Sequence, residues 1–307
     1  MNRTSTIIPY TNLHWHTFEF SIEFREPAFF DKFLGSVLRG ALGYSLRQIC
    51  DIGTYRYIFE TPQTRELSDR KYSEVPRPYV ISVPDHGQTW FATGEIFNFY
   101  LTLIGKGISY LPHFIAAFSY TGDRGIGLKR SKFELTSIES VSISGERELI
   151  YNGDGRFLSE EFFRISLDDL QSLRSQPTQM LLTFLTPLRL IDMKRLVRPD
   201  NFSLQVYLHR SIERIRALGY FHDDIPWFDL DESLITRSES IRSEAFLSWQ
   251  DWEFFVRGRP QKMGGVVGQV ILQGNLAPYC AILESGQWLH VGKGTSYGFG
   301  SVSVQYK

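Results

Sequence analysis

The sequence predicts an α+β fold built from two similar halves. Three observations lead to this expectation: a strand opens each half, with clear apolar–polar alternation in the first, a helical repeat of apolar residues follows it, and a helix, a glycine-rich stretch and a strand close it. Each half then has the strand–helix–strand–strand–helix–strand order of a ferredoxin-like (RRM-like, βαββαβ) domain. The recurrence favours an internal duplication, and we place the domains at residues 1–150 and 151–307.

The first half begins with a strand over residues 18–24, followed by a helix whose apolar positions recur every three or four residues. Those positions are Leu34, Leu38, Leu42, Leu46 and Ile49. Gly35, Gly40 and Gly43 lie beside this stripe, and each costs roughly 1 kcal/mol relative to alanine in a helix interior. We therefore expect another backbone, of protein or RNA, to pack closely against this helix.

The remaining elements follow in the same way. A strand-like run over residues 90–104 leads to a helix near 109–119, a glycine-rich stretch over 122–130 and a strand from residue 133. The second half opens with a strand over 180–190 and a helix over 204–218, for which Gly219 is the stop signal. It closes with a strand over 264–274, a short helix over 277–284, a glycine-rich loop and a strand over 301–306.

Composition is typical of a folded globular protein, with 42% hydrophobic and 22% charged residues among 307. Cys50 and Cys280 match no metal or redox spacing, and no His, Cys or carboxylate pair has ligand spacing, so we expect neither metal nor cofactor. No apolar stretch suits a signal peptide or a membrane span, which predicts a cytoplasmic protein. The net charge of −1 hides local basic clusters, one of which contains Arg124, Lys129, Arg130 and Lys132.

The glycine-rich loop (residues 290–300) carries the strongest functional signal. Small residues let backbone N–H groups approach a ligand, and rows of such donors suit phosphate oxygens. The spacing excludes a dinucleotide fingerprint, because three residues separate Gly294 from Gly298 and a strand follows. It also excludes a phosphate-binding P-loop, because Gly294 follows Lys293. An anionic ligand other than a nucleotide cofactor is the leading expectation.

The chain resembles the repeat-cleaving endoribonuclease branch of the RAMP superfamily of CRISPR-associated RNA-binding proteins. The resemblance depends on the glycine-rich loop and on short segments in a fixed order along nearly the whole chain. These are LRGALG (38–43), PRPYVI (76–81), GE (94–95), LIG (103–105), FLTPLRL (184–190), GGVVG (264–268) and HVGK (290–293). The resemblance implies tandem ferredoxin-like domains that bind CRISPR repeat RNA.

The resemblance also implies metal-independent transesterification, in which the ribose 2′-hydroxyl attacks the adjacent phosphorus and leaves a 2′,3′-cyclic phosphate. Members of the family commonly place a histidine on or beside the first helix, whereas this helix has Tyr44 at the plausible position. The predicted catalytic residues are Tyr44, Arg39, Arg47 and His290. The predicted RNA-binding residues are Gly292, Lys293, Gly294, Gly298, Gly300, Arg257, Arg259, Lys262 and Arg130.

Several alternatives stay open at this point. His14 and His16 are competing acid–base candidates, and the aromatic residues before Arg257 either stack bases or face a core. The chain is an active nuclease, a catalytically inactive subunit that holds CRISPR RNA in an interference complex with other CRISPR-associated effector subunits, or a protein-interaction scaffold. We expect a monomer or a homodimer, without membrane association.

Overall fold

Strand β1 (His14–Phe24) is the centre of the first sheet and pairs antiparallel with β5 (Ile96–Ile104) and β6 (Phe133–Val141). The strands β3 (Tyr79–Ser82) and β7 (Arg147–Tyr151) complete the order β3-β5-β1-β6-β7, and β8 (Ile165–Ser166) also pairs with β1. A separate pair joins β2 (Ala28–Phe29) to β4 (Trp90–Phe91). This computed structural model describes residues 12–30, 33–60, 75–84, 87–172, 177–256 and 259–306.

Two helices pack on this sheet, α1 (Leu34–Ile49) and α4 (Leu111–Arg124). Leu38, Leu42 and Leu46 of α1 are at most 1% exposed, and each buried leucine stabilises the fold by roughly 1.5–3 kcal/mol. The short helix α2 (Ile52–Tyr55) and a π-helical segment (Arg56–Glu60) follow α1. Asp51 caps α2 by accepting hydrogen bonds from the N–H groups of Gly53 and Thr54.

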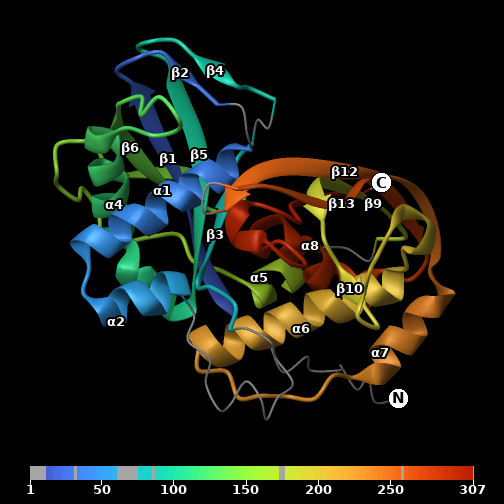
Figure 1. Cartoon of the computed structure of the whole chain (residues 1–307). Coiled ribbons are helices and arrows are strands. Elements are labelled where there is room, and N and C mark those ends of the chain that lie inside the picture. Colours follow the sequence, from blue (N-terminus) through green and yellow to red (C-terminus); the bar gives the residue numbers. More distant parts are fainter. Residues whose placement is uncertain are drawn as a thin grey trace.

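The second sheet has the order β12-β13-β9-β14. Its strands are β9 (Gln179–Leu188), β12 (Arg242–Val256), β13 (Arg259–Gln273) and β14 (Val302–Tyr306). Two main helices accompany it, α6 (Leu204–His222) and α8 (Cys280–Leu289). Smaller elements are α5 (Leu167–Ser172), α7 (Glu232–Arg237), β10 (Ile191–Asp192) and β11 (Arg195–Leu196). Figure 1 shows the two sheets with their helices side by side.

The two halves share one topology, which confirms the predicted tandem ferredoxin-like fold. In each half the second, third, first and fourth core strands are neighbours in that order: β3-β5-β1-β6 in the first and β12-β13-β9-β14 in the second. A helix follows the first core strand and another precedes the fourth in both halves. The division at residue 150 stays a prediction; the pairing of β8 with β1 continues the first sheet beyond that residue.

Two of the differences between the predicted elements and the structure involve glycines. The run over residues 90–104 is interrupted, since Gly94 adopts a φ of 81° between β4 and β5. The prediction that Gly219 stops α6 is wrong, because the helix continues to His222. A Cβ at Gly219 would lie 3.0 Å from the side chain of Ile225, so this glycine makes room for the returning chain inside a regular helix.

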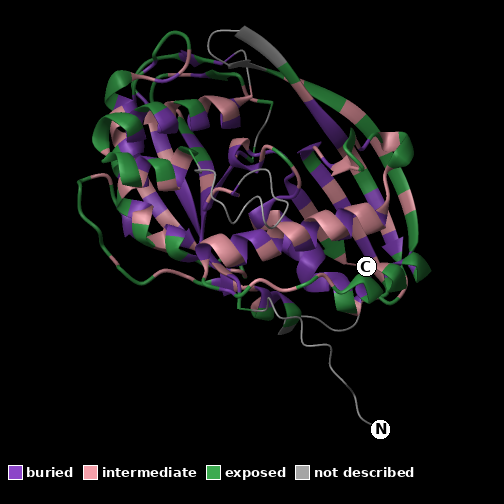
Figure 2. Ribbon diagram, turned by 60° about the horizontal axis from the view of Figure 1, so that its bottom comes forward, coloured by how far each residue is buried: buried purple, intermediate pink, exposed green. Residues whose placement is uncertain are grey.

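The two domains share a tightly packed boundary. Trp15 from β1 is fully buried in the hydrophobic cluster of the second domain, and its ring centroid lies 5.9 Å from that of Trp288. His14 Nδ1 lies 2.9 Å from a carboxylate oxygen of Asp223, at the end of α6. Figure 2 shows buried residues along both sheets and on the helix sides that face them. The domains therefore form one body that holds α1 against the C-terminal segment.

Candidate functional site

The glycine loop (residues 290–300) docks on the first helix of the other domain. Arg39 of α1 donates a hydrogen bond from Nε to Ser296 Oγ at 3.1 Å. Its guanidinium carbon lies 4.3 Å from the ring centroids of both Tyr297 and Phe59. Figure 1 shows α1 running alongside the red C-terminal region at the domain boundary. The sequence placed Arg39 and this loop in one site, and the structure brings them into contact.

Gly35 explains how the loop approaches the helix so closely. A Cβ at Gly35 would lie 2.0 Å from the carbonyl oxygen of Tyr297, a separation that atoms in proteins do not tolerate. The predicted close approach of another backbone to α1 is therefore confirmed at this position. Gly43 meets a side chain instead, because its Cβ would lie 2.2 Å from the ring of Phe59.

Most N–H groups of the glycine loop bind the protein's own carbonyl oxygens. Lys293 donates to Arg189 O at 2.9 Å, Gly298 to Thr295 O at 2.9 Å and Gly300 to Pro187 O at 3.1 Å. At Gly300, φ is 70° and a Cβ would lie 1.9 Å from Val291 O, so only glycine suits this turn. The loop is consequently a folded plug, with the exposed side chain of Lys293 at its surface.

His290 is turned inward. It has a φ of 53° and is 1% exposed, and its Nδ1 lies 3.0 Å from the carbonyl oxygen of Phe299. This position corrects the expectation that His290 touches substrate, because its ring contacts the backbone of the glycine loop. We assign His290 a structural role in holding the loop closed.

Tyr44 projects from a different side of α1 than Arg39. The two residues are five positions apart, which rotates them by roughly 140° about the helix axis and separates them by about 7.5 Å along it. Tyr44 is 59% exposed, and Arg47 is also exposed. Tyr44 borders a pocket of about 390 Å³ between α1, α4 and the turn over residues 125–130. Arg130 lines the same pocket, so the structure unites two site residues from distant parts of the sequence.

The long hairpin of β12 and β13 holds the remaining predicted RNA contacts. Lys262 Nζ lies 3.1 Å from a carboxylate oxygen of Glu253, and both side chains are largely exposed. Arg257 lies outside the described residues, and Arg259 belongs to β13 with its side chain outside the description.

Trp252 and Trp249, on the same hairpin, belong to the aromatic residues before Arg257, which were expected either to stack RNA bases or to face a core. Trp252 packs on Phe33 with ring centroids 3.9 Å apart, and so belongs to the domain boundary. The ring of Trp249 stacks on the guanidinium group of Arg198, whose central carbon lies 3.7 Å from the ring centroid.

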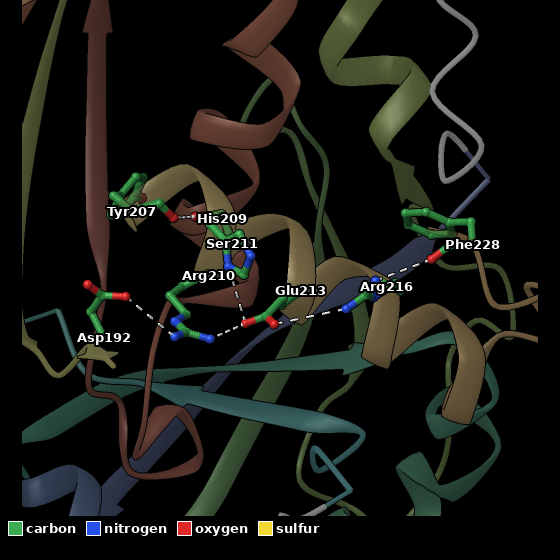
Figure 3. A network of polar contacts seen from close by, with 8 residues as sticks. All are labelled: Asp192, Tyr207, His209, Arg210, Ser211, Glu213, Arg216 and Phe228. Carbon is green, nitrogen blue, oxygen red and sulfur yellow. Dashed lines mark hydrogen bonds and ion pairs between the residues drawn. The ribbon is translucent and has the colours of Figure 1, made fainter. Parts of the chain in front are cut away.

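The basic cluster on α6 is largely neutralised within the protein (Figure 3). Arg210 Nη1 donates to Glu213 at 2.5 Å, and its other nitrogen lies 3.9 Å from Asp192. Arg216 lies 4.0 Å from Glu213 and donates to the carbonyl oxygen of Phe228. These arginines mainly order the helix and its surroundings.

Buried histidines occupy the domain boundary. His16 Nδ1 lies 3.0 Å from Phe163 O, and burial lowers the pKa of His16 to about 4. His222 Nε2 lies 2.6 Å from Pro76 O and its Nδ1 lies 3.3 Å from the hydroxyl of Tyr57; burial lowers the pKa of His222 to about 4 as well. His14 pairs with Asp223. The partners of these side chains named above all lie outside the glycine loop.

Sequence reasoning missed three partners of Arg39: Ser296, Tyr297 and Phe59. The signal for the first two was the hydroxyl and aromatic residues inside the glycine-rich loop. Phe59 had no signal, because it reaches Arg39 through the π-helical segment after α2. Across the described ranges, no group of three or more His, Cys, Asp or Glu side chains is arranged to hold a metal ion. None of the helices in those ranges has both the length and the apolar character needed to cross a bilayer.

Comparison with protein families agrees with this arrangement. Residues 182–302 match the family of the CRISPR-associated endoribonuclease Cas6. This part of the chain is therefore similar to Cas6 proteins. Residues 13–162 match a family model described as an N-terminal domain. An uncharacterised protein of Archaeoglobus fulgidus is 26% identical over 236 residues, which cover 76% of this chain and 74% of that protein.

Solved structures show the same fold at low sequence identity. Cas6 of Thermus thermophilus superposes with a TM-score of 0.57 at 13% identity, over 95% of this chain and 99% of that one. A partial Cas6-RT-Cas1–Cas2 complex gives a TM-score of 0.62 at 14% identity over 96% of this chain. This chain spans 46% of the length of that matched chain.

Proposed function

We propose that this chain binds CRISPR repeat RNA and cleaves precursor CRISPR RNA by metal-independent transesterification. A base removes the proton of a ribose 2′-hydroxyl, the 2′-oxygen forms a bond to the adjacent phosphorus, and the bond from phosphorus to the 5′-oxygen breaks. An acid protonates that oxygen, so the products carry a 2′,3′-cyclic phosphate and a 5′-hydroxyl. The observation that carries the proposal is the docking of the glycine loop on α1 through Arg39, Ser296 and Gly35.

The chain's own residues divide the work in this proposal. Lys293 and Arg47 are exposed cations on the two docked elements and stabilise the charge that develops on the phosphorane oxygens. Tyr44 supplies the hydroxyl group for proton transfer from the exposed side of α1. Arg39 is buried between two aromatic rings and acts as a positioning residue for the loop.

One assay tests the reaction. The protein is incubated in EDTA with repeat RNA from its own genomic neighbourhood, and in parallel with RNA that carries a 2′-deoxyribose at the cleavage position. We expect cleavage of the first RNA and none of the second. Cleavage that stops in EDTA or that proceeds on the deoxy substrate contradicts the mechanism.

Variants test the residues. Tyr44→Phe should lower the single-turnover rate by roughly 10²–10⁴-fold if its hydroxyl transfers a proton. The matched control is Tyr100→Phe, which removes a half-buried hydroxyl from β5 that accepts a hydrogen bond from Arg147. A Tyr44→Phe rate within a factor of a few of the control rate removes Tyr44 from the mechanism.

A second function is favoured by a specific observation: α1 contains no histidine, and the nearby His290 is buried against Phe299 O. In this case the chain is a catalytically inactive subunit that holds CRISPR RNA and associates with CRISPR-associated effector subunits. RNA binding without cleavage in the same assay identifies this function. A protein that binds no RNA at any salt concentration would instead be a protein-interaction scaffold.

A further inference from the structure

The pocket beside Tyr44 has an opening that the protein's own packing does not explain. Gly40 lies inside α1 and lines this pocket. A Cβ at Gly40 would meet no atom of the described residues within 4 Å. Alanine would fit there and would favour the helix by roughly 1 kcal/mol. The missing side chain at Gly40 therefore keeps space open in the pocket, in contrast to Gly35 and Gly43, which make room for protein atoms.

The lining combines aromatic rings with cations. Phe29, Tyr44 and Leu128 are 48%, 59% and 75% exposed, so three of the large apolar side chains at the protein surface gather around one opening. Arg124 and Arg130 lie on the opposite wall from α1, at the end of α4 and in the following turn, and both are exposed. Rings with adjacent guanidinium groups suit an unpaired base and its phosphate.

The inner part of the pocket adds two hydroxyl groups. Ser45 and Thr121 are nearly fully buried, and their oxygens lie 2.8 Å apart. Thr121 donates its proton to Ala117 O, so Ser45 donates to Thr121 and keeps a lone pair for a further donor. An N–H group on the edge of a nucleobase has the chemistry to use this acceptor.

The turn that carries Arg130 is built at a conformational cost. Arg130 adopts a left-handed φ of 52°, and a Cβ at Gly125 would lie 1.9 Å from Arg130 O. Left-handed backbone is unfavourable for residues other than glycine by roughly 1–2 kcal/mol. The short bridge between Ile126 and Ser131 holds the turn in this shape. The fold thus fixes the backbone of Arg130 at the edge of the pocket.

We propose that this pocket binds one unpaired nucleotide of the RNA substrate, with the base against Phe29 and Tyr44 and its phosphate on Arg124 and Arg130. The proposal deepens the function proposed above and rests on it for the identity of the RNA. A volume of about 390 Å³ lies in the usual range for small-ligand sites, ~300–1,000 Å³. The pocket and the contact between Arg39 and the glycine loop lie on different sides of α1, and Arg39 and Tyr44 are about 7.5 Å apart along the helix axis.

The test uses the repeat RNA made uncleavable by a 2′-deoxyribose, with 2-aminopurine replacing one base at a time. Fluorescence of 2-aminopurine falls when the base stacks. We expect one position to be quenched by the wild-type protein and to remain bright with Gly40→Leu, which places a branched side chain at the pocket wall. Loss of one stacked base should weaken binding roughly 5- to 150-fold.

Ala116→Leu is the matched control, because it adds the same side chain at an exposed position of α4 outside the pocket lining. Arg130→Ala is the second variant; it should weaken binding and make affinity less dependent on salt, without adding bulk. RNA binding in which Gly40→Leu matches Ala116→Leu at every labelled position refutes the pocket and leaves the cleavage proposal intact. Quenching that depends on Gly40, without cleavage of the natural RNA, supports the pocket and refutes cleavage. A chain that binds no RNA refutes both.

Discussion

Gly35 and Gly40 allow one sharp test of how the glycine loop is docked. The same substitution to alanine, five residues apart on α1, adds a methyl group in contact with the loop at one position and in open space at the other. Gly40→Ala should stabilise the protein by roughly 1 kcal/mol through helix propensity. Gly35→Ala gains less, because Gly35 is the second residue of α1, and its Cβ starts 2.0 Å from Tyr297 O.

The difference between the two variants contains the packing cost and the smaller propensity gain at the helix start, which act in the same direction. An overpacked contact costs about 1–3 kcal/mol, so Gly35→Ala should be less stable than Gly40→Ala by at least that amount. To restore an ordinary contact of 3.4 Å, the carbonyl of Tyr297 has to retreat by 1.4 Å. A displacement on the order of 1 Å near reacting groups costs about 10²-fold in rate, and we expect that loss of cleavage in Gly35→Ala.

Urea unfolding followed by circular dichroism measures the stabilities, and single-turnover cleavage measures the rate. Equal stability of the two variants would show that the loop does not press on Gly35 in solution. A Gly35→Ala protein of reduced stability that cleaves at the wild-type rate would instead separate loop docking from catalysis.

Three further predictions follow from the contacts. Burial lowers the pKa of His16 and His222 to about 4. Because these histidines bind protons more readily in the unfolded chain, each should lower the free energy of unfolding by about 2 kcal/mol between pH 7 and pH 5. Urea unfolding that gives the same stability at both pH values would contradict this. Arg39→Lys should reduce both stability and cleavage, because lysine lacks the planar group that lies between two rings and binds Ser296; wild-type melting and cleavage of this variant would exclude the role. Lys293→Ala should make the slope of log affinity against log salt less steep by about 0.7 if Lys293 contacts one phosphate, measured by filter binding over a salt series.

The local patterns of the sequence predicted most of the fold. The leucine period of α1 gave the helix its correct face, since Leu38, Leu42 and Leu46 are all buried, and strand alternation located β1. The end of α6 was not predictable in this way. Gly219 leaves space for the side chain of Ile225, which reaches it only after the chain turns back. Glycine is a common helix stop signal, but at position 219 it serves tertiary packing inside a helix that continues.

The candidate site was predicted only in part. The contact between Arg39 and the glycine loop agrees with the order of motifs, but the inward position of His290 depends on a left-handed backbone that no pattern announces. The pocket beside Tyr44 joins three segments separated by many residues. Its one local signal was Gly40, because a glycine inside a helix lowers helix stability. The sequence does not show why glycine stands there; the structure shows empty space beside it.

The shared topology of the two halves gives α1 an unusual position. The turn between α4 and β6 in the first half corresponds to the turn between α8 and β14 in the second, and both border α1. One copy has collapsed onto the helix through Arg39, whereas the other stands away from it and leaves a hollow. The two equivalent turns thus lie on different sides of the same helix, one closed onto it and the other open.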